Sequence, residues 1–141
     1  MNAQAHRYLM VVEDSDDDFE AFTRSCKTIG FSVPIERCVT ADDALTLLHR
    51  TGRLLPALIL MDLNLPGMDG REFLVELKKT PPLRTVPVVI YTTSSNPADV
   101  DFCYENHANS YQLKPTGALE LRNSTLYFAK YWFEVAHLRT S

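Results

Sequence analysis

The sequence lacks the features that mark membrane, secreted and nucleic-acid-binding proteins. No apolar stretch approaches the roughly 20 residues that a membrane span needs, and no secretory signal pattern opens the chain. Adjacent basic residues occur only at Lys78-Lys79, and the formal net charge is -4. Because nucleic-acid-binding proteins normally present a basic face, this composition argues against such a function. We expect a cytoplasmic protein that binds neither nucleic acid nor membranes.

Cysteine is also scarce, and nothing divides the chain. Cys26, Cys38 and Cys103 are odd in number and lack the spacing of metal ligands, which favours free thiols in a reducing compartment. The length of 141 residues fits one domain, and the hydrophobic and charged fractions of 45% and 23% are ordinary for a globular protein. No repeat, low-complexity tract or linker is evident, so we predict a single domain over residues 1–141.

Short apolar runs alternate with longer segments of helical pattern. Strands are expected over residues 7–13, 33–39, 57–62, 86–92 and 110–113. Helices are expected over residues 15–30, 40–52, from 68 towards the prolines at 81 and 82, from 96 onwards, and over 116–138. Five strands alternating with five helices predict a three-layer α/β sandwich around a parallel sheet.

Five acidic residues lie within six positions at the end of the first expected strand, from Glu13 to Asp18. We expect Glu13 and Asp14 to face a cation. Ser15 or Asp16 should cap the following helix, whose first turn favours negative charge because of the helix dipole. Asp17 lies within reach of the outer waters of such a cation, and its role is left open.

Polar residues also follow three other strands, namely Asp62, Thr92-Thr93 and Lys114-Pro115. The carboxyl ends of parallel strands share one edge of the sheet, where ligands bind. Carboxylates without histidine or cysteine favour Mg²⁺. The ammonium of Lys114 and the hydroxyl of Thr92 can hold phosphoryl oxygens, and one carboxylate can act as nucleophile. The sequence therefore predicts a Mg²⁺-dependent phosphoryl-transfer site.

A bound flavin mononucleotide is disfavoured. A flavin phosphate needs backbone N–H groups in a loop rich in glycine, serine or threonine after the first strand. The loop here is strongly acidic and repels a phosphate unless a metal intervenes.

The Glu13-Asp14 pair, Asp62 within the stretch from Met61 to Gly70, Thr92, and Lys114-Pro115 resemble the receiver domain of two-component response regulators. The resemblance spans roughly residues 7–128, in order and at the family's spacing. It implies a CheY-like (flavodoxin-like) fold with strand order 2-1-3-4-5. It also implies a signalling domain that accepts a phosphoryl group from a histidine kinase and catalyses only its own phosphotransfer and dephosphorylation.

The resemblance assigns a role to each residue of the metal site. Asp62 is the implied phosphoacceptor. Asp14, Asp62 and the backbone carbonyl of Asn64 would bind Mg²⁺ directly, and Glu13 would bind it through water. Glu13 stands where aspartate is commoner in the family.

The resemblance also implies a switch. Lys114 would pair with the phosphoryl group, Thr92 would donate a hydrogen bond to it, and Tyr111 would turn inward as Thr92 shifts. Asn64 and Ser94 resemble positions that tune the lifetime of the phosphoryl bond. The surface formed by the fourth helix, fifth strand and fifth helix would then change for an unknown downstream protein.

The last helix extends beyond about residue 128 and has more apolar residues than one helix face accommodates. This tail is similar to that of single-domain response regulators paired with bacterial phytochrome histidine kinases. A surplus apolar face suggests an interface, so we predict a homodimer. The residues predicted to form it are Phe128, Tyr131, Trp132 and Val135.

Two other functions stay open. A small Mg²⁺-dependent phosphohydrolase could use the same nucleophile, but such enzymes typically have a second acid two residues later, where this chain has Asn64. A phosphorylation-independent interaction scaffold is the other alternative, although such proteins normally lack one of the key residues.

Overall fold

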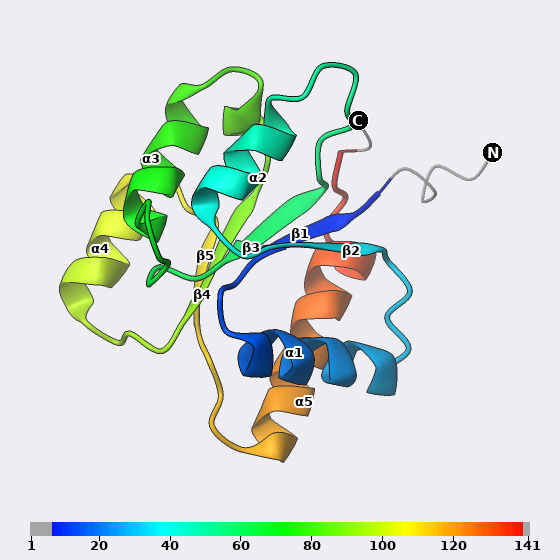
Figure 1. Cartoon of the computed structure of the whole chain (residues 1–141). Coiled ribbons are helices and arrows are strands. Elements are labelled where there is room, and N and C mark those ends of the chain that lie inside the picture. The colour runs from blue at the N-terminus through cyan, green and yellow to red at the C-terminus, as the bar shows by residue number, and fades with distance from the viewer. Residues whose placement is uncertain (1–6, 140–141) are drawn as a thin grey trace.

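The sheet forms from the short apolar runs of the sequence. The computed structural model describes residues 7–139 and contains five strands in one parallel sheet, in the order β2-β1-β3-β4-β5 (Figure 1). This order confirms the prediction. The strands are β1 (Leu9–Val12), β2 (Ile35–Cys38), β3 (Leu58–Met61), β4 (Val88–Thr92) and β5 (Ser110–Leu113).

Four of the five α-helices in residues 7–139 connect successive strands, α5 follows β5, and together they cover both faces of the sheet. Helices α1 and α5 lie on one face, and α2, α3 and α4 lie on the other (Figure 1). The helices are α1 (Asp16–Thr28), α2 (Ala41–Leu48), α3 (Gly70–Lys79), α4 (Pro97–Glu105) and α5 (Ala118–Lys130), with a short 3-10 helix η2 (Leu83–Thr85) after α3. None of the helices within residues 7–139 is both long enough and apolar enough to cross a membrane.

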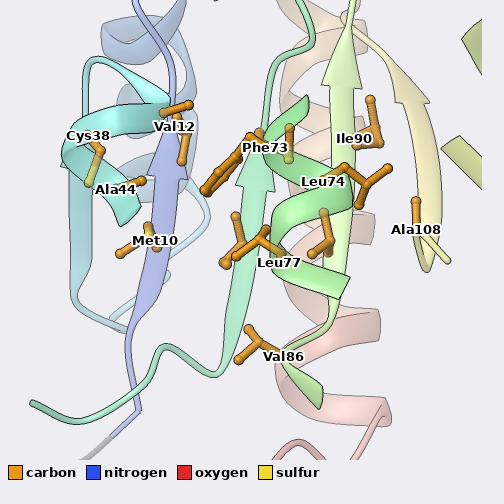
Figure 2. Packing of buried hydrophobic residues seen from close by; sticks show 14 of the residues in the cluster. Met10, Val12, Cys38, Ala44, Phe73, Leu74, Leu77, Val86, Ile90 and Ala108 are labelled. Carbon is orange, nitrogen blue, oxygen red and sulfur yellow. The ribbon is translucent and has the colours of Figure 1, made fainter. Parts of the chain in front are cut away.

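The alternation of side chains along β1 divides the core into two layers. Met10 and Val12 pack with Phe73 and Leu77 of α3 on one face, as Figure 2 shows. Leu9 and Val11 face the opposite layer, next to α1 and α5. Successive residues of a strand point to opposite faces, so a strand buried on both sides must be apolar throughout, as β1 and β3 are.

Side-chain caps fix where the helices begin. Ser15 accepts a hydrogen bond from the N–H of Asp18 and caps α1, and Thr40 accepts one from Asp43 and caps α2. Helix α2 ends at Leu48, earlier than the predicted residue 52, because the chain turns there and Gly52 takes a positive φ of 79° that no helix contains.

The end of the chain differs from the predicted helix over residues 116–138. Helix α5 ends at Lys130, a π-helical turn η3 (Tyr131–Val135) follows, and Ala136 is extended. The wider turn lets Phe128 and Phe133, five residues apart, both enter the layer beneath α1 and α5. A regular α-helix would repeat on that face after four residues, at Trp132. The helical segment does pass residue 128, but it stops three residues before Leu138.

Candidate functional site

Three carboxylates meet where β1 and β3 end. One oxygen each of Glu13, Asp14 and Asp62 can be chosen so that all lie within 4.8 Å of one another. Glu13 is 4% exposed and Asp62 8% exposed, whereas Asp14 is open to solvent. Oxygen donors at this spacing, without histidine or cysteine, fit a hard divalent cation that retains some of its waters.

The ammonium group of Lys114 lies against this cluster from the end of β5. Its Nζ is 2.7 Å from Glu13 Oε1, 2.7 Å from Asp62 Oδ2 and 2.8 Å from Asp18 Oδ2. Burial alone would lower the pKa of Lys114, but hydrogen bonds to the three carboxylates outweigh it and raise the pKa. Lys114 therefore stays charged and neutralises part of the acid cluster.

Glu13 has the least favourable surroundings for a charged carboxylate. Burial raises its pKa, and the hydrogen bond from Lys114 offsets this in part. The N–H of Ser15 also donates to Glu13 Oε2, at 3.2 Å. A cation at the cluster would favour the ionised form of Glu13 further, since an opposite charge stabilises a carboxylate.

The two oxygens of Asp62 have different environments. Oδ1 accepts hydrogen bonds from the N–H groups of Leu63 at 2.7 Å and Asn64 at 3.3 Å, while Oδ2 contacts Lys114. The side chain is therefore fixed by its own loop. The contact of Asn64 with Asp62 is made by its backbone N–H, and it does not test the metal-binding role of the carbonyl, which stays a prediction.

Gly70 allows helix α3 to start directly behind this loop. A Cβ atom at residue 70 would lie 2.4 Å from the carbonyl oxygen of Asp62 and 2.6 Å from Cα of Leu63. The N–H of Gly70 donates to the carbonyl of Leu63 at 2.9 Å. The glycine of the motif is thus required by packing against the backbone of Asp62.

Thr92, Ser94 and Tyr111 form one contiguous group at the end of β4. Thr92 is fully buried, and its Oγ1 accepts a hydrogen bond from the N–H of Ser94 at 3.3 Å. The hydroxyl of Tyr111 donates to the carbonyl of Ser94 at 2.7 Å. Tyr111 therefore points inward, against the β4–α4 loop.

Residues 9–125 match the model of the response regulator receiver domain. The chain belongs to this family. Response regulator Rcp1 of Synechocystis is 36% identical over 138 residues, which cover 94% of this chain and 92% of Rcp1. The "Probable methanogenesis regulatory protein FilR2" of Methanothrix harundinacea is 36% identical over 127 residues, covering 88% of this chain and 82% of that protein.

Solved structures of response regulators show the same CheY-like fold. The Mn²⁺-bound form of Rcp1 superposes with a TM-score of 0.87 at 34% identity, covering 94% of this chain and 99% of that one. The phosphorylated cyanobacterial phytochrome response regulator RcpA superposes with a TM-score of 0.87 at 30% identity, covering 94% and 98%. The fold and the family predicted from the sequence are confirmed.

Two residues that contact the site of this receiver domain, Asp18 and Arg37, are not predicted from the sequence. Asp18 was assigned only to the first turn of α1, but it also binds Lys114 across the site. Arg37 of β2 donates from Nε to the carbonyl of Glu13 at 3.0 Å, and its Nη1 is 2.8 Å from Asp16. The only signal for Asp18 is its position in the first turn of α1, which begins close to the end of β1.

The predicted dimer residues of the receiver domain fall into two groups. Phe128 is 4% exposed and packs against Phe22 and Phe133, so its assignment to an interface was wrong. Tyr131 and Val135 are 53% and 72% exposed. Half-buried Trp132 makes an edge-to-face contact with Tyr131. A groove of about 720 Å³ runs between β5 and this tail, lined among others by Gln112, Ser124, Tyr127, Tyr131 and Trp132.

Proposed function

We propose that Asp62 of this receiver domain accepts a phosphoryl group from a histidine kinase in a Mg²⁺-dependent reaction. The observation that supports the proposal most is the contact of Lys114 with Asp62 beside the two other carboxylates. An oxygen of Asp62 attacks phosphorus as the bond from phosphorus to the histidine nitrogen breaks, and the bonding electron pair stays on the imidazole. Lys114 stabilises the charge on the phosphoryl oxygens. Thr92 donates its hydroxyl proton to one of them, since its Oγ1 only accepts from the N–H of Ser94.

Asp14, Asp62 and Glu13, with the carbonyl of Asn64, would hold the metal ion. When bound, Mg²⁺ supplies positive charge that offsets the carboxylates and the incoming phosphoryl oxygens. The exposed Asp14 gives the cation access from solvent, while buried Glu13 reaches it through water. Asn64 and Ser94 are proposed to tune the lifetime of the aspartyl phosphate.

The test of the phosphoacceptor is incubation with acetyl phosphate and Mg²⁺, followed by intact-protein mass measurement. The wild type should gain one phosphoryl group and Asp62→Asn none, while Asp101→Asn, which removes an exposed acid of α4, should behave as the wild type. Phosphorylation of Asp62→Asn would contradict the assignment. If neither protein reacts and beryllofluoride perturbs neither, the scaffold alternative is favoured.

The metal assignment is tested by Mg²⁺ titration followed by NMR. Asp14→Ala should abolish binding at the site, because it removes the open ligand of the cluster. Asp101→Ala removes the same charge from α4 and should leave the titration unchanged. Equal affinity of the two variants would contradict the proposed ligand set.

The chain is proposed to act as a signalling module and not as an enzyme with external substrates. Turnover of phosphate monoesters that is lost in Asp62→Asn would instead favour the phosphohydrolase.

A bacterial phytochrome kinase is the proposed donor of the phosphoryl group, supported by the similarity to RcpA over nearly the whole chain. Phosphotransfer profiling against the kinases of the host is the direct test. A cytoplasmic location accords with three buried free cysteines.

We also propose one receiver domain over residues 1–141 that forms a homodimer. Phe133 and Leu138 pack into the same core as β1, which supports one domain over the described part of the chain. The dimer would use Tyr131, Trp132 and Val135, beside the surface of α4, β5 and α5 that is proposed to switch. Sedimentation equilibrium should show a dimer for the wild type and a monomer for Val135→Glu. A wild type that stays monomeric at tens of micromolar, with and without beryllofluoride, would contradict it.

A further inference from the structure

A chain of side-chain hydrogen bonds leads from the β4–α4 loop to helix α3. At its centre is Asp99, in the first turn of α4, whose two oxygens have different partners. Oδ1 accepts from Arg71 Nε at 2.9 Å and from Arg71 Nη2 at 2.7 Å. Oδ2 accepts from the hydroxyl of Ser94 at 2.6 Å. Asp99, on α4, therefore joins the loop that follows Thr92 to the start of the neighbouring helix α3.

Arg71 is itself held at the start of α3. Its Nη1 lies 3.0 and 3.1 Å from the two oxygens of Asp69, the residue that caps this helix. Burial alone would lower the pKa of Arg71, but hydrogen bonds to Asp99 and Asp69 raise it. Hydrogen bonds from Ser94 and Arg71 lower the pKa of Asp99. Arg71 and Asp99 stay ionised, so the contacts between them are charge-assisted hydrogen bonds with the fixed fork geometry of a guanidinium.

Ser94 connects this ion pair to the switch residues. Its hydroxyl donates to Asp99, its N–H donates to Thr92 Oγ1, and its carbonyl accepts from the hydroxyl of Tyr111. The backbone of Ser94 thus supplies the hydrogen-bond partner of both Thr92 and Tyr111. Any displacement of Asp99 must move these atoms or break the bond to the Ser94 hydroxyl.

We propose that Arg71 and Asp99 are positioning residues for the switch. Their ion pair between α3 and α4 holds Ser94 where Thr92 and Tyr111 bind it, and so sets both the inward position of Tyr111 and the lifetime of the phosphoryl group on Asp62. The part that concerns lifetime rests on the proposed function of Asp62. Neither Arg71 nor Asp99 has a hydrogen bond or ion pair with Asp62 or Lys114 in residues 7–139, so their effect is indirect.

The competing explanation is an ion pair that only adds stability. Exposed pairs of this kind usually contribute little, and they leave the chemistry unchanged. The Arg71–Asp99 pair differs because the side chains are only 28% and 18% exposed, and because the second oxygen of Asp99 is used by the loop. The two explanations differ in what happens to Tyr111 and to the phosphoryl group when the pair is broken.

The experiment breaks the pair from either side. Asp99→Asn changes α4, and Arg71→Gln changes only α3, leaving the first turn of α4 intact. The matched control is Asp101→Asn, which removes an equal charge from an exposed position on α4. The position of Tyr111 is followed by fluorine NMR of protein labelled with 3-fluorotyrosine, with the resonance assigned from Tyr111→Phe. The lifetime is followed as loss of phosphate after acetyl phosphate is removed, and urea unfolding reports stability.

Both variants should shift the Tyr111 resonance and lose phosphate roughly threefold to tenfold faster, the scale of the net contribution of one ordinary hydrogen bond. Asp101→Asn should match the wild type. The double variant Arg71→Gln/Asp99→Asn should be no faster than Asp99→Asn, since the link is already broken. Arg71→Lys keeps the charge without the fork and should fall between the wild type and Arg71→Gln.

An unchanged Tyr111 resonance and lifetime in Arg71→Gln and Asp99→Asn would overturn the proposal, even if both variants were less stable. Additive effects in the double variant would also overturn it. The fluorine measurement needs no phosphoryl group. A wild type that fails to gain phosphate at Asp62 would therefore refute the proposed function while the link from α3 to Tyr111 is still tested.

Discussion

The carboxyl edge of the sheet and the layer beneath helices α1 and α5 are built by the same strands with opposite chemistry. At the edge, β1 and β3 run into Glu13 and Asp62, two buried acids that share Lys114. In the layer, Leu9 and Val11 of β1 pack among aromatic side chains of the helices. Buried charges gain little net stability, whereas buried apolar area is the main source of it. The layer therefore stabilises the domain, while the edge holds the chemistry.

Phe128→Ala should have the largest effect on the layer. The ring is 4% exposed and packs edge-on against Phe22, so its removal should lower the free energy of unfolding by about 3–5 kcal/mol. Tyr127→Ala, next to it but 68% exposed, is the control and should change little. Urea denaturation measures both, and Mg²⁺ affinity of the folded fraction should be unchanged. Similar losses for the two variants would mean that the layer is not the main source of stability.

Gly70→Ala should affect both regions at once. Its Cβ would meet the carbonyl of Asp62 at 2.4 Å, so either the helix start or the Asp62 loop must move. Overpacking of this kind costs about 1–3 kcal/mol, measured by urea denaturation. Mg²⁺ affinity should fall as well, unlike in Phe128→Ala. A stability loss with unaltered Mg²⁺ binding would show that the loop does not take up the displacement.

A smaller effect is expected from the pH dependence of Lys114. The raised pKa means that the folded protein binds this proton more tightly than the unfolded chain does. The contribution of Lys114 to stability is therefore fully present below its ordinary pKa of 10.5 and is lost as the pH rises through the folded value. The difference in unfolding free energy between the wild type and Lys114→Met, measured in urea, should be constant from neutral pH to 10.5 and shrink above 10.5. A difference that grows there would contradict the sign.

The fold could be predicted because its signals are local. Apolar runs of four or five residues between turn signals favour buried strands by their length, and Ser15, Thr40 and Asn96 each cap a helix with their own side chain. The strand order followed from the family resemblance, not from periodicity. The acids and the lysine of the edge were found because strand ends in a parallel sheet converge.

Other features could not be predicted because they depend on contacts between distant segments. Asp18 and Lys114 are 96 positions apart, and Arg71 and Asp99 are 28 apart. Each of these residues is an ordinary charged side chain on a helix or strand end until the packing brings its partner close. The π-helical turn also depends on tertiary packing, because it buries Phe133 in the core beneath α1 and α5, against which Trp132 packs only half-buried.

This turn has a consequence for insertions and deletions in the chain. A π turn accommodates one residue more than an α turn, so every residue after it is rotated by one position around the helix. Deleting one residue between Phe128 and Phe133 would restore a regular helix and keep the second phenylalanine against the core, but it would shorten the reach of the tail. Inserting one before Phe128 would instead rotate every later side chain by about 100° and turn both phenylalanines away from the core. The end of this helix should therefore tolerate a one-residue deletion between Phe128 and Phe133, but not a one-residue insertion before Phe128.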